Sequence, residues 1–106
     1  MFITKEERLI LAKHKRAQLI KMYREVLTRI VQLNHEKLHV NVTAMFRNGE
    51  FSFDITVFDL TGDNTTLAIY DFYEIKKAQK YVNACISAVK IGNFEKVKAV
   101  TAGIYR

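Results

Sequence analysis

The chain has 106 residues, of which 17 are Lys or Arg and 11 are Asp or Glu, so its formal net charge is +6. This length, with 49% apolar residues, predicts a single domain over residues 1–106 that buries a core without disulfides or metal ions. Plentiful aromatic and β-branched residues exclude intrinsic disorder, and the apolar runs are too short to span a membrane. One cysteine, Cys85, and a charged N-terminus without a signal-peptide stretch favour a cytoplasmic location.

The charge is sorted along the chain into three blocks. Residues 1–37 hold nine Lys or Arg against four Asp or Glu, residues 38–74 hold one against six, and residues 75–106 hold seven against one. An acidic centre therefore lies between two basic ends. Such an arrangement indicates the kind of partner that a protein meets rather than its fold.

Residues 4–36 are predicted to form one long helix. Thr4 and Glu7 have the spacing of a capping box, in which a hydroxyl accepts from a backbone amide three residues later. Apolar residues then recur every three or four positions, as on one face of a helix. These residues include Leu9, Ala12, Leu19, Tyr23, Val26, Ile30 and Leu33. The alternative is a helix broken near residue 14 into two shorter pieces.

A helix of this length exceeds the body of a small domain. Some thirty residues at about 1.5 Å each give a rod of roughly 45 Å, against a radius of gyration of about 13 Å for a compact domain. We expect its N-terminal end to project and to leave apolar side chains uncovered. Uncovered apolar surface on a rod is typical of a homodimer or docking surface. The residues predicted to form this surface are Leu9, Leu11, Leu19, Ile20 and Leu27.

Asn48-Gly49 predicts a two-residue type I′ hairpin turn, because both positions of that turn need a positive φ. The turn fixes a register in which one face of the hairpin pairs apolar residues with each other. These pairs are Ala44–Phe53, Val42–Ile55 and Val40–Val57. The opposite face, with Met45 and Phe58 among Thr, Ser and Asn, is polar enough to remain in water. One face is therefore expected to cover the core and the other to stay open.

Residues 65–70 are predicted to form a short third strand. Asp71 and Glu74 then repeat the capping pattern at the start of a second helix, which Gly92 is placed to end. The apolar stripe of this second helix includes Ile75, Ala78, Val82, Cys85 and Val89.

Residues 93–106 fit either a last helix capped by Asn93 or an edge strand over 96–102, and the helix is favoured. The expected fold class is α+β: a long N-terminal helix, a three-stranded antiparallel sheet, a second helix and a short C-terminal helix or strand.

Residues that could carry catalysis or bind a metal do not form a recognisable set. His35 and His39 are four apart, but no further Cys or His completes a zinc site, which needs three or four ligands. Cys85 falls on an apolar stripe, where a thiol behaves as a small hydrophobe. Asp54 lacks an adjacent base. We therefore expect that the protein is not an enzyme and that it binds neither a metal ion nor a cofactor.

Two lysine-rich helix segments supply the candidate binding residues. They are Lys13, Lys15, Arg16 and Lys21 on the first helix, and Lys76, Lys77 and Lys80 at the start of the second. Clusters of this kind hold phosphate backbones through counterion release and need little sequence specificity. The alternative is solvated helix surface without a ligand. The sequence predicts a small basic binding protein whose partner is nucleic acid, a protein–nucleic-acid complex or an acidic protein surface.

The segment Lys76-Lys77-Ala78-Gln79-Lys80 opens a helix that follows one helix and three strands. In this order of elements, over roughly residues 20–91, the chain resembles the double-stranded-RNA-binding domain. The resemblance implies that these lysines clamp phosphates across the major groove of duplex RNA. The chain departs from the family pattern in its tight Asn48-Gly49 turn, where the family has a longer loop, and in its longer first helix.

The competing prediction is a protein-interaction module, such as an inhibitor or adaptor encoded by a phage or mobile element. It would form a homodimer through the first helix and present its open sheet face to a larger partner. Met45 and Phe58 on that face are typical of an adaptable binding patch.

Overall fold

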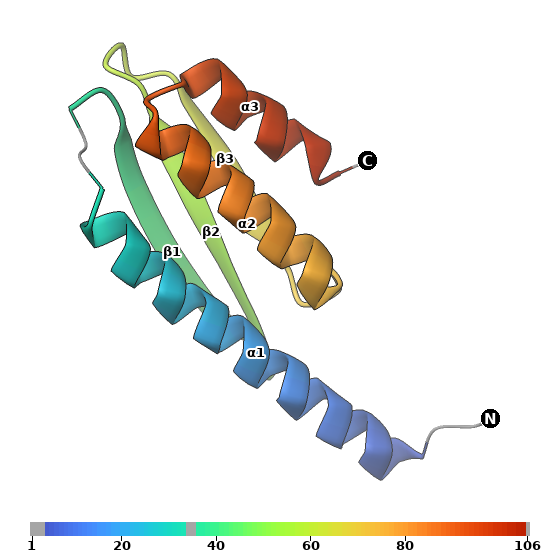
Figure 1. The fold of residues 1–106 in the computed structure, drawn as a ribbon. Helices are drawn as coiled ribbons and strands as arrows, with labels where there is room; N and C mark the ends of the chain where they lie inside the picture. Colours follow the sequence, from blue (N-terminus) through green and yellow to red (C-terminus); the bar gives the residue numbers. More distant parts are fainter. Residues whose placement is uncertain (1–3, 34–35, 106) are drawn as a thin grey trace.

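The computed structural model describes residues 4–33 and 36–105 (Figure 1). The elements in chain order are α1 (Lys5–Val31), β1 (His39–Arg47), β2 (Glu50–Phe58), β3 (Asn64–Ile69), α2 (Ile75–Lys90) and α3 (Phe94–Gly103). The strands form one antiparallel sheet in the order β1-β2-β3. The predicted α+β fold is confirmed, and the C-terminal segment is a helix. Over the described residues, no helix combines the length and the apolar character that a membrane crossing requires.

α1 is one continuous helix of 27 residues, as predicted, and the alternative of a break near residue 14 does not occur. The Thr4 side chain accepts a hydrogen bond from the backbone N–H of Glu7 at 3.1 Å, as the capping pattern predicts. The helix ends at Val31, earlier than predicted. The molecule measures 50 × 27 × 20 Å, and the N-terminal half of α1 projects beyond the sheet and the other helices (Figure 1).

The β1–β2 hairpin has the register that its turn predicts. All nine pairs occur as expected, beginning with Arg47–Glu50 beside the turn. Asn48 and Gly49 have φ values of 53° and 77°, which are the left-handed conformations that a type I′ turn requires. Local turn chemistry and the alternation of apolar residues therefore select the same pairing.

The three helices cover one face of the sheet, and the core lies between these two layers (Figure 1). The core includes Leu19, Met22 and Val26 of α1, Phe51, Phe53, Ile55 and Val57 of β2, Val82 and Cys85 of α2, Val97 of α3, and Ile104 directly after α3. Leu19, which we expected on a dimer surface, is thus fully buried. It lies on the side of α1 that packs on the sheet, so it is not available to a second copy.

α2 begins later than the capping pattern predicts. Its N-cap is Glu74, without a side-chain hydrogen bond, so Asp71 is not the cap. The preceding segment is held by ring packing instead: the Tyr70 and Phe72 rings stack at 5.2 Å, and Tyr73 is buried. Tyr73 belongs to the hydrophobic core, and this tertiary contact favours a path of the chain that the local capping pattern does not predict.

α2 passes into α3 through a tight junction. Gly92 has a φ of 71°, and its N–H donates to the Val89 carbonyl at 3.0 Å, while the N–H of Asn93 donates to the Ala88 carbonyl at 3.0 Å. This pair of bonds is the Schellman motif. The Asn93 side chain then accepts from the N–H of Lys96 at 3.1 Å and caps α3. The predicted glycine terminus and asparagine cap are both confirmed.

Candidate nucleic-acid interface

α1 and α2 lie side by side on the sheet (Figure 1). Side chains of both helices line a shallow groove between them. The groove is lined by Gln18, Lys21, Met22 and Glu25 of α1 and by Ile75 and Gln79 of α2. Side chains that are neighbours on one side of a helix are three or four positions apart. Arg29 therefore lies on the same side of α1 as Gln18 and Glu25. Two helices that meet along such a flank can present cations from both sides to one ligand.

A side-chain network joins the two helices across this groove. The Arg29 guanidinium donates to Oδ1 of Asn83 at 2.7 Å, and the Gln79 amide donates to the same oxygen at 2.9 Å. An Arg donor makes a strong, charge-assisted bond, and Gln79 lies one helical turn before Asn83. The network therefore holds a positive charge over the groove in a fixed place.

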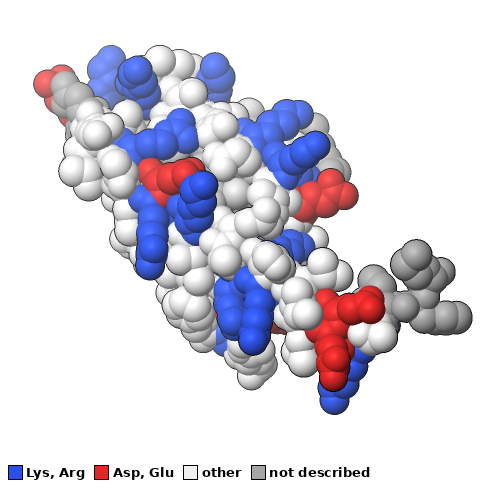
Figure 2. All heavy atoms as spheres, turned by 60° about the horizontal axis from the view of Figure 1, so that its bottom comes forward, with Lys and Arg blue, Asp and Glu red and all other residues white. Residues whose placement is uncertain are grey.

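Further cations surround the network. Lys21 and Arg24 lie on the outer surface of α1 beside Glu25 and Arg29. Lys76 and Lys80 are exposed on α2, one turn apart. In Figure 2, Lys and Arg side chains are spread over the face shown, and Asp and Glu side chains cover less of it. We call Lys21, Arg24, Arg29, Lys76 and Lys80 the groove cations.

Two predicted binding residues, Lys15 and Arg16, lie at the hairpin end instead. Arg16 Nη1 donates to the Gly49 carbonyl at 3.0 Å, so this side chain supports the turn. Both residues line a hollow that also contains Glu50 and Asp71, whose carboxylates reduce the local positive charge. The structure therefore does not bring these cations together with those on α2.

Lys13 and Lys77 also lie apart from the groove. Lys13 is on the projecting half of α1, where it lines a hollow with Ile10 and His14. Lys77 is half-buried, and its ammonium lies 5.2 Å from the centre of the Tyr73 ring. A cation over an aromatic face is stabilised by the ring. Of the seven predicted residues, only Lys21 lines the groove. Lys76 and Lys80 are exposed on α2 beside it, and the Lys80 ammonium lies 5.8 Å from the centre of the Tyr81 ring.

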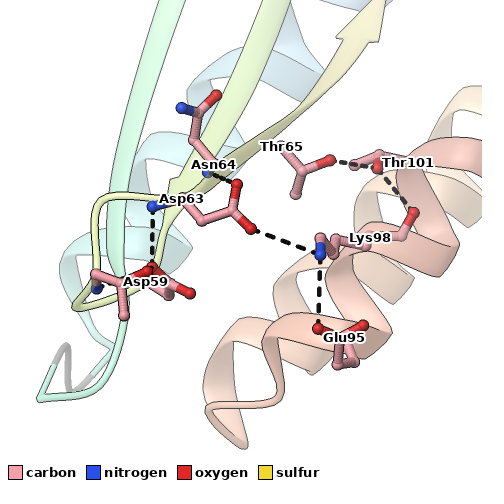
Figure 3. A network of polar contacts seen from close by, with 8 residues as sticks. Asp59, Asp63, Asn64, Thr65, Glu95, Lys98 and Thr101 are labelled. Atoms are coloured by element: carbon pink, nitrogen blue, oxygen red, sulfur yellow. Dashed lines mark hydrogen bonds and ion pairs between the residues drawn. The ribbon is translucent and has the colours of Figure 1, made fainter.

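Lys98, on α3, is neutralised by two carboxylates (Figure 3). Its Nζ lies 3.5 Å from Oε1 of Glu95 and 3.6 Å from Oδ2 of Asp63. Glu95 first, and Asp63 second, raise the pKa of the Lys98 ammonium. This lysine already has partners within the protein, so we leave it out of the candidate interface.

The acids of the β2–β3 loop have structural partners as well. Asp59 Oδ1 accepts from the Thr61 hydroxyl at 2.6 Å and from the backbone N–H of Asp63 at 3.0 Å. The Thr61 hydroxyl bond is the largest cause of the lowered pKa of Asp59. Aspartates that bond to nearby backbone in this way are typical of turns. Two of the six acids in the acidic block, Asp59 and Asp63, therefore have a structural role in this loop.

Cys85 is fully buried, and burial raises the pKa of its thiol to about 12. The thiolate is the reactive form, so we expect a thiol reagent such as DTNB to leave the folded protein unlabelled at mildly alkaline pH. Unfolding in guanidinium should expose the thiol and allow complete labelling. The variant Cys85→Ser serves as the control for background reaction. Rapid labelling of the folded protein would contradict the buried position.

The described part of the chain contains no candidate metal site. Among those residues, no group of three or more His, Cys, Asp or Glu side chains is gathered in one place. His35, four positions before His39, lies outside the described residues.

Arg29, Gln79 and Asn83 are the functional candidates that sequence reasoning missed. Gln79 and Asn83 have helical i, i+4 spacing, and Arg29 follows Glu25 by the same interval. These spacings show which residues share a face of one helix. They do not show that the two faces meet, because Arg29 and Asn83 are 54 positions apart.

Comparison with protein-family models, with curated proteins and with solved structures finds no match to this chain.

Proposed function

We propose that this chain is a non-enzymatic binding protein whose groove cations hold the phosphate backbone of a nucleic acid. The observation that supports this function is the approach of Arg29 to Asn83, which joins two cationic helix surfaces along one groove. Glu25 is the acid that lines this groove. Contacts from Lys and Arg to phosphate contribute affinity without reading the base sequence. Cytoplasmic nucleic acid of either kind is the partner class that we infer.

The spacing of the lysines on α2 suits a backbone ligand. Lys76 and Lys80 are four positions apart, which is about 6 Å along the helix axis, so both can contact one strand. On the other side of the groove, Lys21 and Arg24 lie close to Arg29. A strand that follows the groove would meet cations on both sides, whereas no aromatic ring lines the groove in the described part of the chain. Binding is therefore expected to tolerate changes in base sequence.

The double variant Lys76→Ala/Lys80→Ala tests this function. Fluorescence anisotropy with short RNA and DNA duplexes should show affinity that falls steeply between about 50 and 200 mM salt. In the double variant, the slope of log affinity against log salt should decrease by about two, one for each phosphate contact removed. Because the lysines are exposed, the thermal unfolding transition should stay unchanged.

The variant Arg47→Ala is the matched control, because Arg47 is exposed at the end of β1 and away from the groove. It should keep the wild-type slope and affinity. Absence of binding at low salt, or an equal loss in Arg47→Ala, would falsify the proposed groove.

A specific observation favours protein interaction as a second candidate function. Leu9, Ile10 and Leu11, on the projecting half of α1, are each more than half exposed. Contiguous exposed apolar side chains are typical of a docking site for another protein. A regulator or adaptor that uses this end of α1 would lose its partner on Leu9→Lys/Leu11→Lys while keeping its nucleic-acid affinity.

A further inference from the structure

β1 is an edge strand with an outer side that no described element pairs. It has nine residues, and its only full charge is at the end, on Arg47. In an antiparallel strand the backbone groups of alternate residues point to opposite sides, so half of those in β1 face away from β2. Native proteins usually protect such an edge with Lys, Pro or a bulge. β1 has neither Lys nor Pro, and its pairing with β2 is continuous.

The side chains around this edge are apolar and poorly covered. On the core face of the sheet, Val40 and Val42 are only half-buried, Ala44 is exposed, and the Phe46 side chain is 67% exposed. Their partners on β2 are all buried. The helices therefore cover the core face of β2 but not that of β1, whose apolar side chains remain partly exposed.

The neighbouring flank of α1 continues this surface. Ile20, Leu27 and Val31 fall on the side of the helix opposite to the flank that meets α2, since each residue advances by about 100°. Ile20 is half-buried, Leu27 is exposed, and Val31 is 83% exposed. The outer side of β1 and this flank of α1 thus form one strip. It combines backbone N–H and C=O groups that have no strand partner with apolar side chains.

We propose that a second copy of this chain pairs antiparallel with β1, so that two three-stranded sheets become one six-stranded sheet across a two-fold axis at Thr43. This register is chosen because it pairs all nine residues of the strand. On the core face it sets Val42 opposite Ala44 and Val40 opposite Phe46 of the second copy. Strand pairs of this apolar kind stabilise a sheet. Like charges do not meet in the interior of the pairing, because residues 40–46 are uncharged.

The strip is long enough for a continuous strand pair. Nine residues at about 3.4 Å each give it a length of roughly 30 Å. In this pairing, Phe46 of one copy lies opposite Val40 of the other copy. Val40 is at the end of β1 that lies nearest to Val31 of α1 in the same copy. The inference does not depend on nucleic-acid binding.

Disulfide trapping tests the register directly. Opposed residues of antiparallel strands have Cα atoms about 4.5–5.5 Å apart, which a disulfide can bridge. Thr43→Cys should therefore form a covalent dimer under mild oxidation, since Thr43 faces itself across the axis. The control Thr66→Cys places an exposed thiol on the same sheet face but on β3, and it should stay uncrosslinked. The native thiol of Cys85 is buried and does not contribute.

Sedimentation equilibrium tests the association itself. The wild type should have twice the chain mass of 12.3 kDa. Ala44→Lys and Leu27→Lys should each weaken the dimer by about tenfold or more, because each places a charge in the apolar strip. Thr66→Lys, on β3, should leave it intact. A wild type that stays monomeric overturns the proposal, as does equal trapping of both cysteine variants. A dimer that Leu11→Lys dissociates and Ala44→Lys does not would move the interface to the projecting end of α1.

Discussion

Replacement of Leu19 by Asp is expected to unfold the domain, whereas the same replacement at Leu27 leaves it folded. Leu19 is fully buried between α1 and the sheet, and Leu27 is exposed on the flank of α1. Truncation of a buried Leu to Ala costs about 2–5 kcal/mol, and an unpaired buried carboxylate costs more. That loss is comparable with the total stability of a small domain, about 5–15 kcal/mol. Thermal unfolding followed by circular dichroism measures the difference.

Leu19→Met is the control for the first substitution, because it keeps the volume and the apolar character of the side chain. Its cost should stay below about 1.5 kcal/mol. Cooperative unfolding of Leu19→Asp near the wild-type temperature would contradict the buried position. Leu27→Asp also separates folding from association, since it should weaken the proposed dimer without lowering the unfolding temperature of the monomer.

The contrast between these two leucines explains what helical periodicity can and cannot predict. The apolar residues of α1 form a face so broad that both Leu19 and Leu27 belong to it. Periodicity identifies the apolar face of α1. How much of that face the sheet covers depends on the neighbouring elements. α2 occupies one flank of α1, and β1 leaves the other partly open. Sequence alone therefore could not separate core from surface within that face.

Features that rest on local chemistry were predictable. The Asn48-Gly49 turn fixes the hairpin register because its two positive φ values admit few residues. The Thr4 cap, and the Asn93 cap that follows Gly92, each satisfy backbone amides within three residues in sequence. Such bonds need no distant partner, so residue type and spacing are enough to find them.

Features that rest on contacts between distant segments were not predictable. The Asp71 cap fails because packing of the Tyr73 ring sets the path of the chain before α2. The groove depends on the meeting of Arg29 with Asn83. Likewise, Arg16 has the charge of a binding residue but supports a turn 33 positions away. A charge pattern along the sequence therefore overestimates the number of cations that share one surface.

Gly49→Val is expected to destabilise the domain by about 1–3 kcal/mol, the usual cost of a non-glycine residue held in a strained backbone conformation. Gly49 has a φ of 77°, which a β-branched residue adopts only with strain. A Cβ added at this position meets no atom within 4 Å, so a steric clash does not contribute. For a domain of this size, each kcal/mol lowers the melting temperature by about 4–8 °C. Differential scanning calorimetry measures the shift.

Asn48→Gly is the matched control, because it relaxes the neighbouring turn position, where φ is 53°. It should change stability by only a few tenths of a kcal/mol, since glycine adopts this conformation readily. Arg16→Ala tests the remaining contribution, because its guanidinium bonds the Gly49 carbonyl from an exposed position. Its cost should not exceed about 3 kcal/mol, the upper range for a hydrogen bond with a charged group. If Gly49→Val melts like the wild type, or if Asn48→Gly is as damaging, the strain at this turn does not control the stability of the hairpin.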